Sequence, residues 1–71
     1  MIDVTLRNNL KVLRAHKDIT QEQLAAAIGV TRKTINTIER GRFTPSTILA
    51  LKLAQYFEVP VEDIFYFDSG G

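Results

Sequence analysis

Apolar residues recur along this chain of 71 residues at the spacing of short helices. Leu6, Leu10 and Leu13 follow one another at intervals of four and three residues, which predicts a first helix over residues 6–17. Further along, residues 46–57 are apolar on nearly every side, as in a helix that is central or that a partner covers. The pattern therefore predicts a small, mainly helical protein.

Between these segments the sequence predicts two shorter helices joined by a tight turn. Thr20 is a suitable N-cap for the first helix, and Gln23 stands where a capping box places its second member. Gly29 can end that helix in a left-handed conformation, Thr31 can cap the next helix, and Gly41 can end it. Apolar residues at helical spacing give both helices a buried face: Leu24, Ala25, Ile28, Ile35 and Ile38. These features together predict a helix-turn-helix, whose second helix enters the major groove of DNA.

The remaining segments predict one more helix and two short strands. Pro60 opens a fifth helix that runs to Ile64, because proline is tolerated in a first helical turn. Ile2, Val4 and Leu6 alternate with polar residues, and residues 65–68 alternate in the same way, which predicts short strands; the segment 2–4 is expected to pair with residues 65–68. Frayed ends are the alternative. The predicted fold class is all-α, a compact five-helix bundle with a short two-stranded antiparallel sheet formed by the N- and C-terminal segments.

Composition restricts the class of protein further. Residues 1–71 suffice for a single domain, and without cysteine this domain must be stabilised by apolar packing alone. No apolar run approaches the ~20 residues of a membrane span, and the start lacks the features of a signal peptide, so we expect a cytoplasmic protein. The sequence contains no Ser-His-Asp set, phosphate loop or metal-ligand spacing, and the lone His16 is expected at the surface. We therefore expect no enzyme activity, metal, cofactor or small-molecule ligand.

Charge is distributed unevenly, although the net charge is only +1. Between residues 31 and 47 the single acid, Glu39, stands among four basic residues, Arg32, Lys33, Arg40 and Arg42. From residue 48 onward the single base, Lys52, is outnumbered by four acids, Glu58, Glu62, Asp63 and Asp68. The first group suits contact with phosphates and the second is repelled by them. An ordinary solvated surface with a chance asymmetry is the alternative.

Four residues of the second helix of the pair carry groups that can read bases. Arg32 and Lys33 can donate to O6 and N7 of guanine. Asn36 can bridge N6 and N7 of adenine, and Thr37 can meet the methyl group of thymine. Contact with phosphates alone is the alternative for the two cations, and plain solvation is the alternative for Asn36.

A family resemblance rests on two stretches, NLKVLRAHKDITQEQLAAAIGVTRKTINTIERGRFTPS and LALKLAQYFEVPVEDIF. Over residues 9–65 the chain resembles the lambda-repressor-like, Cro-type helix-turn-helix regulators, also called the XRE family, in their small stand-alone form. The resemblance implies a sequence-specific transcriptional regulator that binds double-stranded DNA with its third helix in the major groove. It further implies a homodimer on an inverted-repeat operator, acting as a repressor at the nucleoid.

The resemblance also implies roles for individual residues. Gln21 matches a phosphate-contacting residue at the start of the second helix, and Arg14 with Glu39 matches an ion pair that ties the first helix to the third. Arg42 and Thr44 match a loop that touches the DNA backbone. The complete set of expected DNA-binding residues is Gln21, Thr31, Arg32, Lys33, Asn36, Thr37, Arg40, Arg42 and Thr44.

Self-association is expected because one recognition helix spans too few base pairs for much specificity. The apolar surplus lies in residues 46–57 and in a segment after the acidic stretch, on the side that charge keeps away from DNA. The predicted dimer interface consists of Ile64, Phe65, Tyr66 and Phe67, with Phe65 or Phe67 as its anchor. The alternative function is a protein-interaction module, such as an antitoxin-like partner of another protein, which has no need of the basic cluster.

Overall fold

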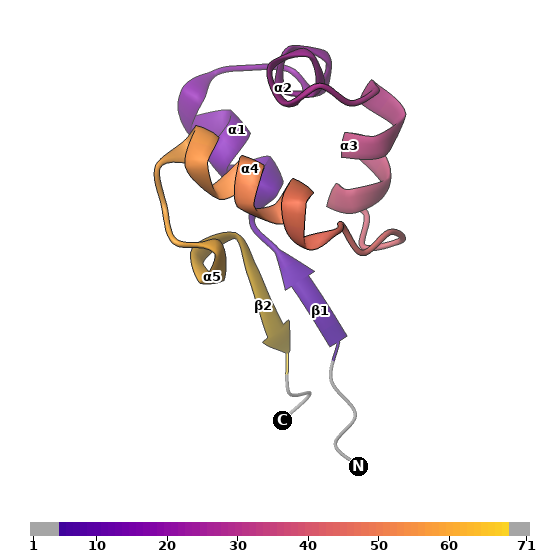
Figure 1. Cartoon of the computed structure of the whole chain (residues 1–71), viewed down its shortest axis with the longest axis vertical. Helices are drawn as coiled ribbons and strands as arrows, with labels where there is room; N and C mark the ends of the chain where they lie inside the picture. Colours follow the sequence, from indigo (N-terminus) through magenta and orange to yellow (C-terminus); the bar gives the residue numbers. More distant parts are fainter. Residues whose placement is uncertain (1–4, 69–71) are drawn as a thin grey trace.

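The computed structural model describes residues 5–68, which form five helices and two strands (Figure 1). In chain order the elements are β1 (Thr5–Asn8), α1 (Leu10–Lys17), α2 (Gln21–Ile28), α3 (Arg32–Glu39), α4 (Thr47–Phe57), α5 (Val61–Ile64) and β2 (Phe65–Asp68). Helices α1 to α4 gather at one end of the molecule, and the paired strands extend from the other end (Figure 1). This arrangement confirms the predicted helical fold with a short antiparallel sheet.

The ends of the two central helices are fixed by short polar side chains and a glycine. The Thr20 hydroxyl accepts from the backbone N–H of Gln23 at 3.0 Å, and the Gln23 side-chain oxygen accepts from the N–H of Thr20 at 2.8 Å. Gly29 ends α2 with φ at 89°, a left-handed conformation that glycine adopts without steric cost. The Thr31 hydroxyl accepts from the N–H of Thr34 at 3.3 Å and caps α3. The structure thus confirms the predicted capping box and the turn between α2 and α3.

The prediction of a helix from Leu6 was wrong, because α1 begins at Leu10. Leu6 lies in β1, opposite Phe67 of β2, as its alternating spacing predicted. Asn8 marks the change from strand to helix, since its side-chain oxygen accepts from the N–H of Leu10 at 3.1 Å and its amide donates to the carbonyl of Ile38 at 2.9 Å. The backbone of β1 pairs with that of β2. This long-range pairing stabilises a strand at Leu6, although the spacing of the leucines favours a helix.

The sheet has two chemically different faces. Because side chains alternate along a strand, Leu6 and Phe67 share one face, and Arg7 and Asp68 share the other. Arg7 donates to Asp68 across the strands at 2.9 Å, in an exposed ion pair. Residues 2–4, which the sequence assigns to the N-terminal strand, lie outside the described residues.

Ten apolar side chains form the core, and every helix contributes to it. They are Leu10, Leu24, Ala25, Ile28, Ile35, Ile38, Leu53, Ala54, Phe57 and Ile64. Ile64 is 0% exposed, so its place in the predicted dimer interface is corrected: its side chain is enclosed by its own chain and offers no surface to a partner. On α4, by contrast, Ile48 and Leu51 remain exposed, and they leave an apolar surface uncovered in the single chain.

A mostly buried ion pair joins α1 to the end of α3. Nε of Arg14 lies 2.6 Å from Oε2 of Glu39, and Nη2 of Arg14 donates to Oε1 at 3.0 Å. Nη1 donates to the carbonyl of Ile19 at 3.0 Å, in the turn before α2. The side chains are only 14% and 6% exposed, and the hydrogen bonds that Arg14 donates to Glu39 raise the pKa of Arg14 above its ordinary value despite the opposing effect of burial. This is the ion pair that the resemblance implied, and it ties three segments together.

Removal of one partner from this pair should leave a buried charge without compensation. We expect Glu39→Ala to lower the free energy of unfolding by about 3 kcal/mol, measured by urea denaturation monitored by circular dichroism. The double variant Arg14→Met, Glu39→Leu removes both charges and should lie within about 1 kcal/mol of the wild type.

The matched control is Glu22→Ala, which removes an exposed carboxylate from the first turn of α2. That variant should lose less than about 1 kcal/mol, since the carboxylate interacts only with the helix terminus. An unchanged urea midpoint for Glu39→Ala would show that the pair contributes nothing to stability.

Candidate nucleic-acid interface

Helix α3 has one buried face and one polar face. Ile35 and Ile38 are 0% and 1% exposed and anchor the helix in the core. The polar side of this helix carries Arg32, Lys33, Asn36 and Thr37, which the sequence predicts to contact DNA, and Arg40 follows as the C-cap. Burial of the apolar face therefore determines which side chains α3 presents to the outside.

The cations of the predicted site are exposed and lack acidic partners. Arg32, Lys33, Arg40 and Arg42 are all exposed, and within residues 5–68 none of them takes part in an ion pair. The acid of this region, Glu39, is turned inward to Arg14. The outer face of α3 and the loop after it therefore keep a positive charge that is suited to phosphates or to guanine.

Two polar residues of α3 are held by bonds within the protein. The Thr37 hydroxyl donates to the backbone carbonyls of Lys33 and Thr34, both at 3.0 Å. The Asn36 amide donates to the side-chain oxygen of Gln21 at 3.4 Å. Both residues are only partly exposed, so their side chains are oriented before any contact with DNA.

Gln21, which is expected to contact a phosphate, also makes hydrogen bonds within the protein. Its amide nitrogen donates to Oε1 of Glu39 at 3.0 Å, and its oxygen accepts from Asn36. The side chain therefore bridges α2 and α3 inside the protein. The second N–H of the Gln21 amide, together with the backbone N–H groups that no helical carbonyl reaches, can meet a phosphate at the start of α2.

The loop after α3 leaves the helix through a tight left-handed turn. Gly41 has φ at 74°, its N–H donates to the carbonyl of Ile38, and the N–H of Arg42 donates to that of Thr37, both at 2.9 Å. This pair of bonds is a Schellman motif, which needs a left-handed residue that glycine supplies at least cost. The turn places Arg42 and Thr44 in an exposed loop beyond the end of α3.

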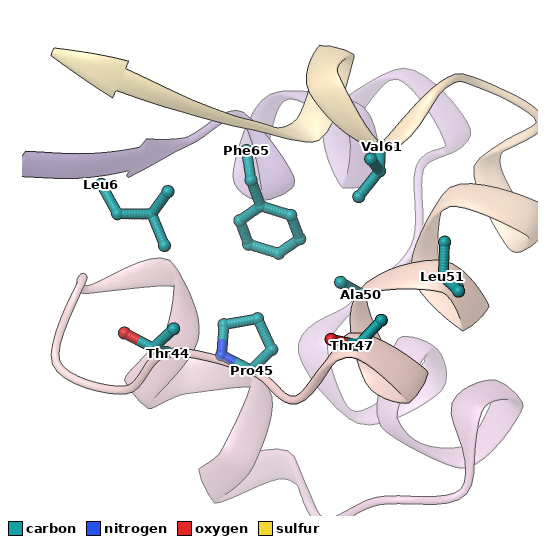
Figure 2. A pocket seen from close by; sticks show the side chains of 8 residues that line it. All are labelled: Leu6, Thr44, Pro45, Thr47, Ala50, Leu51, Val61 and Phe65. Atoms are coloured by element: carbon teal, nitrogen blue, oxygen red, sulfur yellow. The ribbon is translucent and has the colours of Figure 1, made fainter.

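A shallow apolar groove of about 270 Å³ lies between the sheet and the start of α4 (Figure 2). Its lining residues are Leu6, Thr44, Pro45, Thr47, Ala50, Leu51, Val61 and Phe65. The side chains of Leu6 and Phe65 point from the strands toward Pro45 on the opposite wall (Figure 2). The groove therefore joins the loop of the predicted DNA site to the sheet of the predicted dimer interface.

The aromatic residues of β2 differ in how much surface they offer to a partner. Phe67 is 68% exposed and Tyr66 is 43% exposed. Phe65 is partly buried and packs against the core. Since Phe67 shares a face of the sheet with Leu6 and Phe65, it lies on the side of the groove and is the most accessible aromatic residue of the predicted interface.

Two structurally important links were missed by the sequence reasoning. The Asn9 side chain donates to the carbonyl of Asp63 at 3.0 Å, and the Asn9 N–H donates to that of Ile64 at 2.9 Å, so α1 is tied to α5. The contact between Gln21 and Asn36 was also missed. These partners are far apart along the chain, and no local pattern signals such a link.

Other kinds of site find no support among the described residues. None of the described helices has the length and apolar character to cross a membrane. Over residues 5–68, no group of three or more His, Asp or Glu side chains is arranged to hold a metal ion. His16 lies exposed near the end of α1.

Residues 10–64 match the family model described as helix-turn-helix, HTH_3. An uncharacterized HTH-type transcriptional regulator of Methanocaldococcus jannaschii is 48% identical over 64 residues, which are 90% of this chain and 97% of that protein. The transcriptional repressor RstR of the cryptic phage CTXphi, from Vibrio cholerae, is 32% identical over 57 residues, 80% of this chain and 51% of that protein.

A solved structure shows the same fold. The restriction-modification controller protein C.AhdI from Aeromonas hydrophila superposes with a TM-score of 0.69 at 33% identity, over 76% of this chain and 78% of that chain. This chain therefore resembles C.AhdI both in amino-acid sequence and in backbone structure. The chain belongs to the HTH_3 helix-turn-helix family, the XRE and Cro–lambda-repressor-like DNA-binding transcriptional regulators, which are not enzymes.

Proposed function

We propose that this protein is a repressor that binds an inverted-repeat operator as a homodimer, with α3 in the major groove of each half-site. The observation that carries the proposal is the outer face of α3, where exposed cations that form no ion pair within residues 5–68 stand beside Asn36 and Thr37. Occupation of an operator by such a dimer excludes polymerase from the promoter. The relative RstR is named a transcriptional repressor, which favours this direction of regulation.

In this proposal, base reading is divided among four residues of α3. Arg32 and Lys33, at the start of the helix, donate to guanine. Asn36 bridges adenine. The Thr37 hydroxyl is bonded to backbone carbonyls, which leaves the methyl group of Thr37 for contact with thymine.

Phosphate contacts surround the base-reading residues. Arg40, Arg42 and Thr44 lie at the end of α3 and in the loop after it, where they can follow one strand of the duplex. Gln21 and Thr31 contribute the backbone N–H groups at the starts of α2 and α3, since a helix N-terminus favours an anion. Such contacts position the protein on DNA without specifying its sequence. A DNA target also places the protein at the nucleoid of the cytoplasm.

The proposed dimer buries the apolar surface that a single chain leaves exposed. Phe67, Ile48 and Leu51 are 68%, 70% and 56% exposed, and Leu51 also lines the groove beside β2. The same C-terminal part of the chain contains the acids Glu58, Glu62, Asp63 and Asp68, whose negative charge is repelled by the phosphates of DNA. Two copies that meet here would keep both recognition helices free to enter successive major grooves about 34 Å apart.

Base-reading and phosphate-contacting residues should respond differently to removal. Arg32→Ala should weaken binding to the cognate site by roughly 1–3 kcal/mol and relax the preference at one base pair. Arg42→Ala should weaken binding to all sequences alike and reduce the salt slope by about 1. Fluorescence anisotropy on cognate and random duplexes across a salt series measures both effects.

Lys11→Ala is the matched control, since it removes an exposed cation from α1, on a different helix from the site. Its affinity should remain close to that of the wild type on both duplexes. If Arg32→Ala loses the same free energy on cognate and random DNA, with no change in base preference, then Arg32 contacts phosphates and not bases.

Self-association should depend on the exposed aromatic residue of β2. We expect the wild type to sediment as a dimer at micromolar concentration and Phe67→Asp to sediment as a monomer, because a charge in an apolar interface lacks a partner. The variant should bind a single half-site normally and a two-fold site less tightly. Val12→Asp, which places the same charge on exposed apolar surface of α1, should remain a dimer.

A monomeric wild type would refute the proposed dimer. In that case the exposed apolar surface would be available to bind a different protein, as the alternative function of a protein-interaction module predicts. Dimerisation of Phe67→Asp at the wild-type concentration would place the interface elsewhere.

A further inference from the structure

Hydrogen bonds connect the buried ion pair to the outer face of α3 through two further side chains. Arg14 donates twice to Glu39, at 2.6 and 3.0 Å. Gln21 donates from Nε2 to Oε1 of Glu39 at 3.0 Å. Asn36 then donates from Nδ2 to the oxygen of Gln21 at 3.4 Å. The series begins on α1, passes through the end of α3 and the start of α2, and finishes on the polar face of α3.

The chemistry of the donors fixes the direction of every bond in this series. A carboxylate in an ion pair can only accept, so Gln21 must turn its NH2 group toward Glu39. The side-chain oxygen of Gln21 is then the atom that faces Asn36. Asn36 must therefore turn its own NH2 group toward Gln21, because two amide oxygens would repel each other. Neither amide is free to exchange the positions of its nitrogen and oxygen.

The fixed amide of Asn36 retains one N–H and one oxygen for a ligand. Adenine offers a donor at N6 and an acceptor at N7 in the major groove, which match this pair. Guanine offers acceptors at both O6 and N7, so its O6 would face the oxygen of the amide. An amide that could turn freely would discriminate less between the two purines.

We propose that Gln21 and Glu39 are positioning residues, which fix the amide of Asn36 and thereby make it select adenine over guanine at one base pair. The inference rests on the proposed function, in which α3 lies in the major groove. It assigns Gln21 a role in sequence preference in addition to the side-chain phosphate contact that the resemblance implied.

Selection from a pool of random duplexes, followed by sequencing, tests the inference with four proteins. Wild-type protein gives the preferred site, and Asn36→Ala identifies the base pair whose preference depends on Asn36. Gln21→Met keeps the length of the side chain but removes both of its hydrogen bonds. Gln23→Met is the matched control, because it removes an amide from the same helix and costs a bond of the capping box without touching Asn36.

We expect the wild type and Gln23→Met to prefer adenine over guanine about tenfold or more at that base pair. Gln21→Met should reduce the preference to about threefold or less there, and should keep the preferences at the other base pairs. If Gln21→Met retains the wild-type preference, or instead weakens binding to all sequences equally, the inference is overturned while the proposed function stands. A wild type that enriches no sequence would overturn both.

The free proteins supply a second measurement that does not involve DNA. Nuclear magnetic resonance of the side-chain amides should show two well-separated Asn36 N–H signals with slowed rotation in the wild type and in Gln23→Met. In Gln21→Met the signals should move toward those of a solvated amide. Identical Asn36 signals in Gln21→Met and the wild type would show that the amide is not held by Gln21, and would overturn the inference.

Discussion

The ion pair between Arg14 and Glu39 constrains the rest of this structure more than any other single contact. Its side chains are only 14% and 6% exposed, so each charge depends on the other for the stabilisation that water would otherwise give. The guanidinium also donates to the carbonyl of Ile19, and this fork has a fixed planar geometry. The end of α3, the middle of α1 and the turn before α2 are therefore held at one point and in one orientation.

Apolar packing alone gives weaker control over how an eight-residue helix is rotated. Ile35 and Ile38 determine that α3 is buried on one side, but the hydrophobic effect has no direction. Hydrogen bonds have a direction: at the end of the helix Arg14 donates to Glu39 and Asn8 donates to the carbonyl of Ile38, and at the start the Thr31 hydroxyl accepts from Thr34. The angle at which α3 presents its polar face thus depends on a few polar contacts around a small core.

The features that could be predicted from the sequence are those governed by neighbours in the chain. The capping box of Thr20 and the turn at Gly29 were predicted correctly because both involve residues within a few positions of each other. Leu6 fitted both a helical and an alternating spacing, and its pairing with β2, which decides between them, depends on residues some sixty positions away. The DNA-contacting candidates on α3 followed from helical spacing, whereas the internal bonds of Gln21 depend on the angle between two helices, which the sequence does not display.

The position of the groove adds a connection between the two proposed surfaces. Thr44 and Pro45 form one wall and belong to the loop after α3, while Leu6 and Phe65 form the other wall and belong to the sheet (Figure 2). A second copy seated in this groove would contact the loop as well as the sheet. Any restriction of this loop by the second copy would reduce the entropy that Arg42 loses when it binds a phosphate. In the proposed dimer, self-association would therefore favour DNA contact through the loop of each copy, in addition to bringing two recognition helices together.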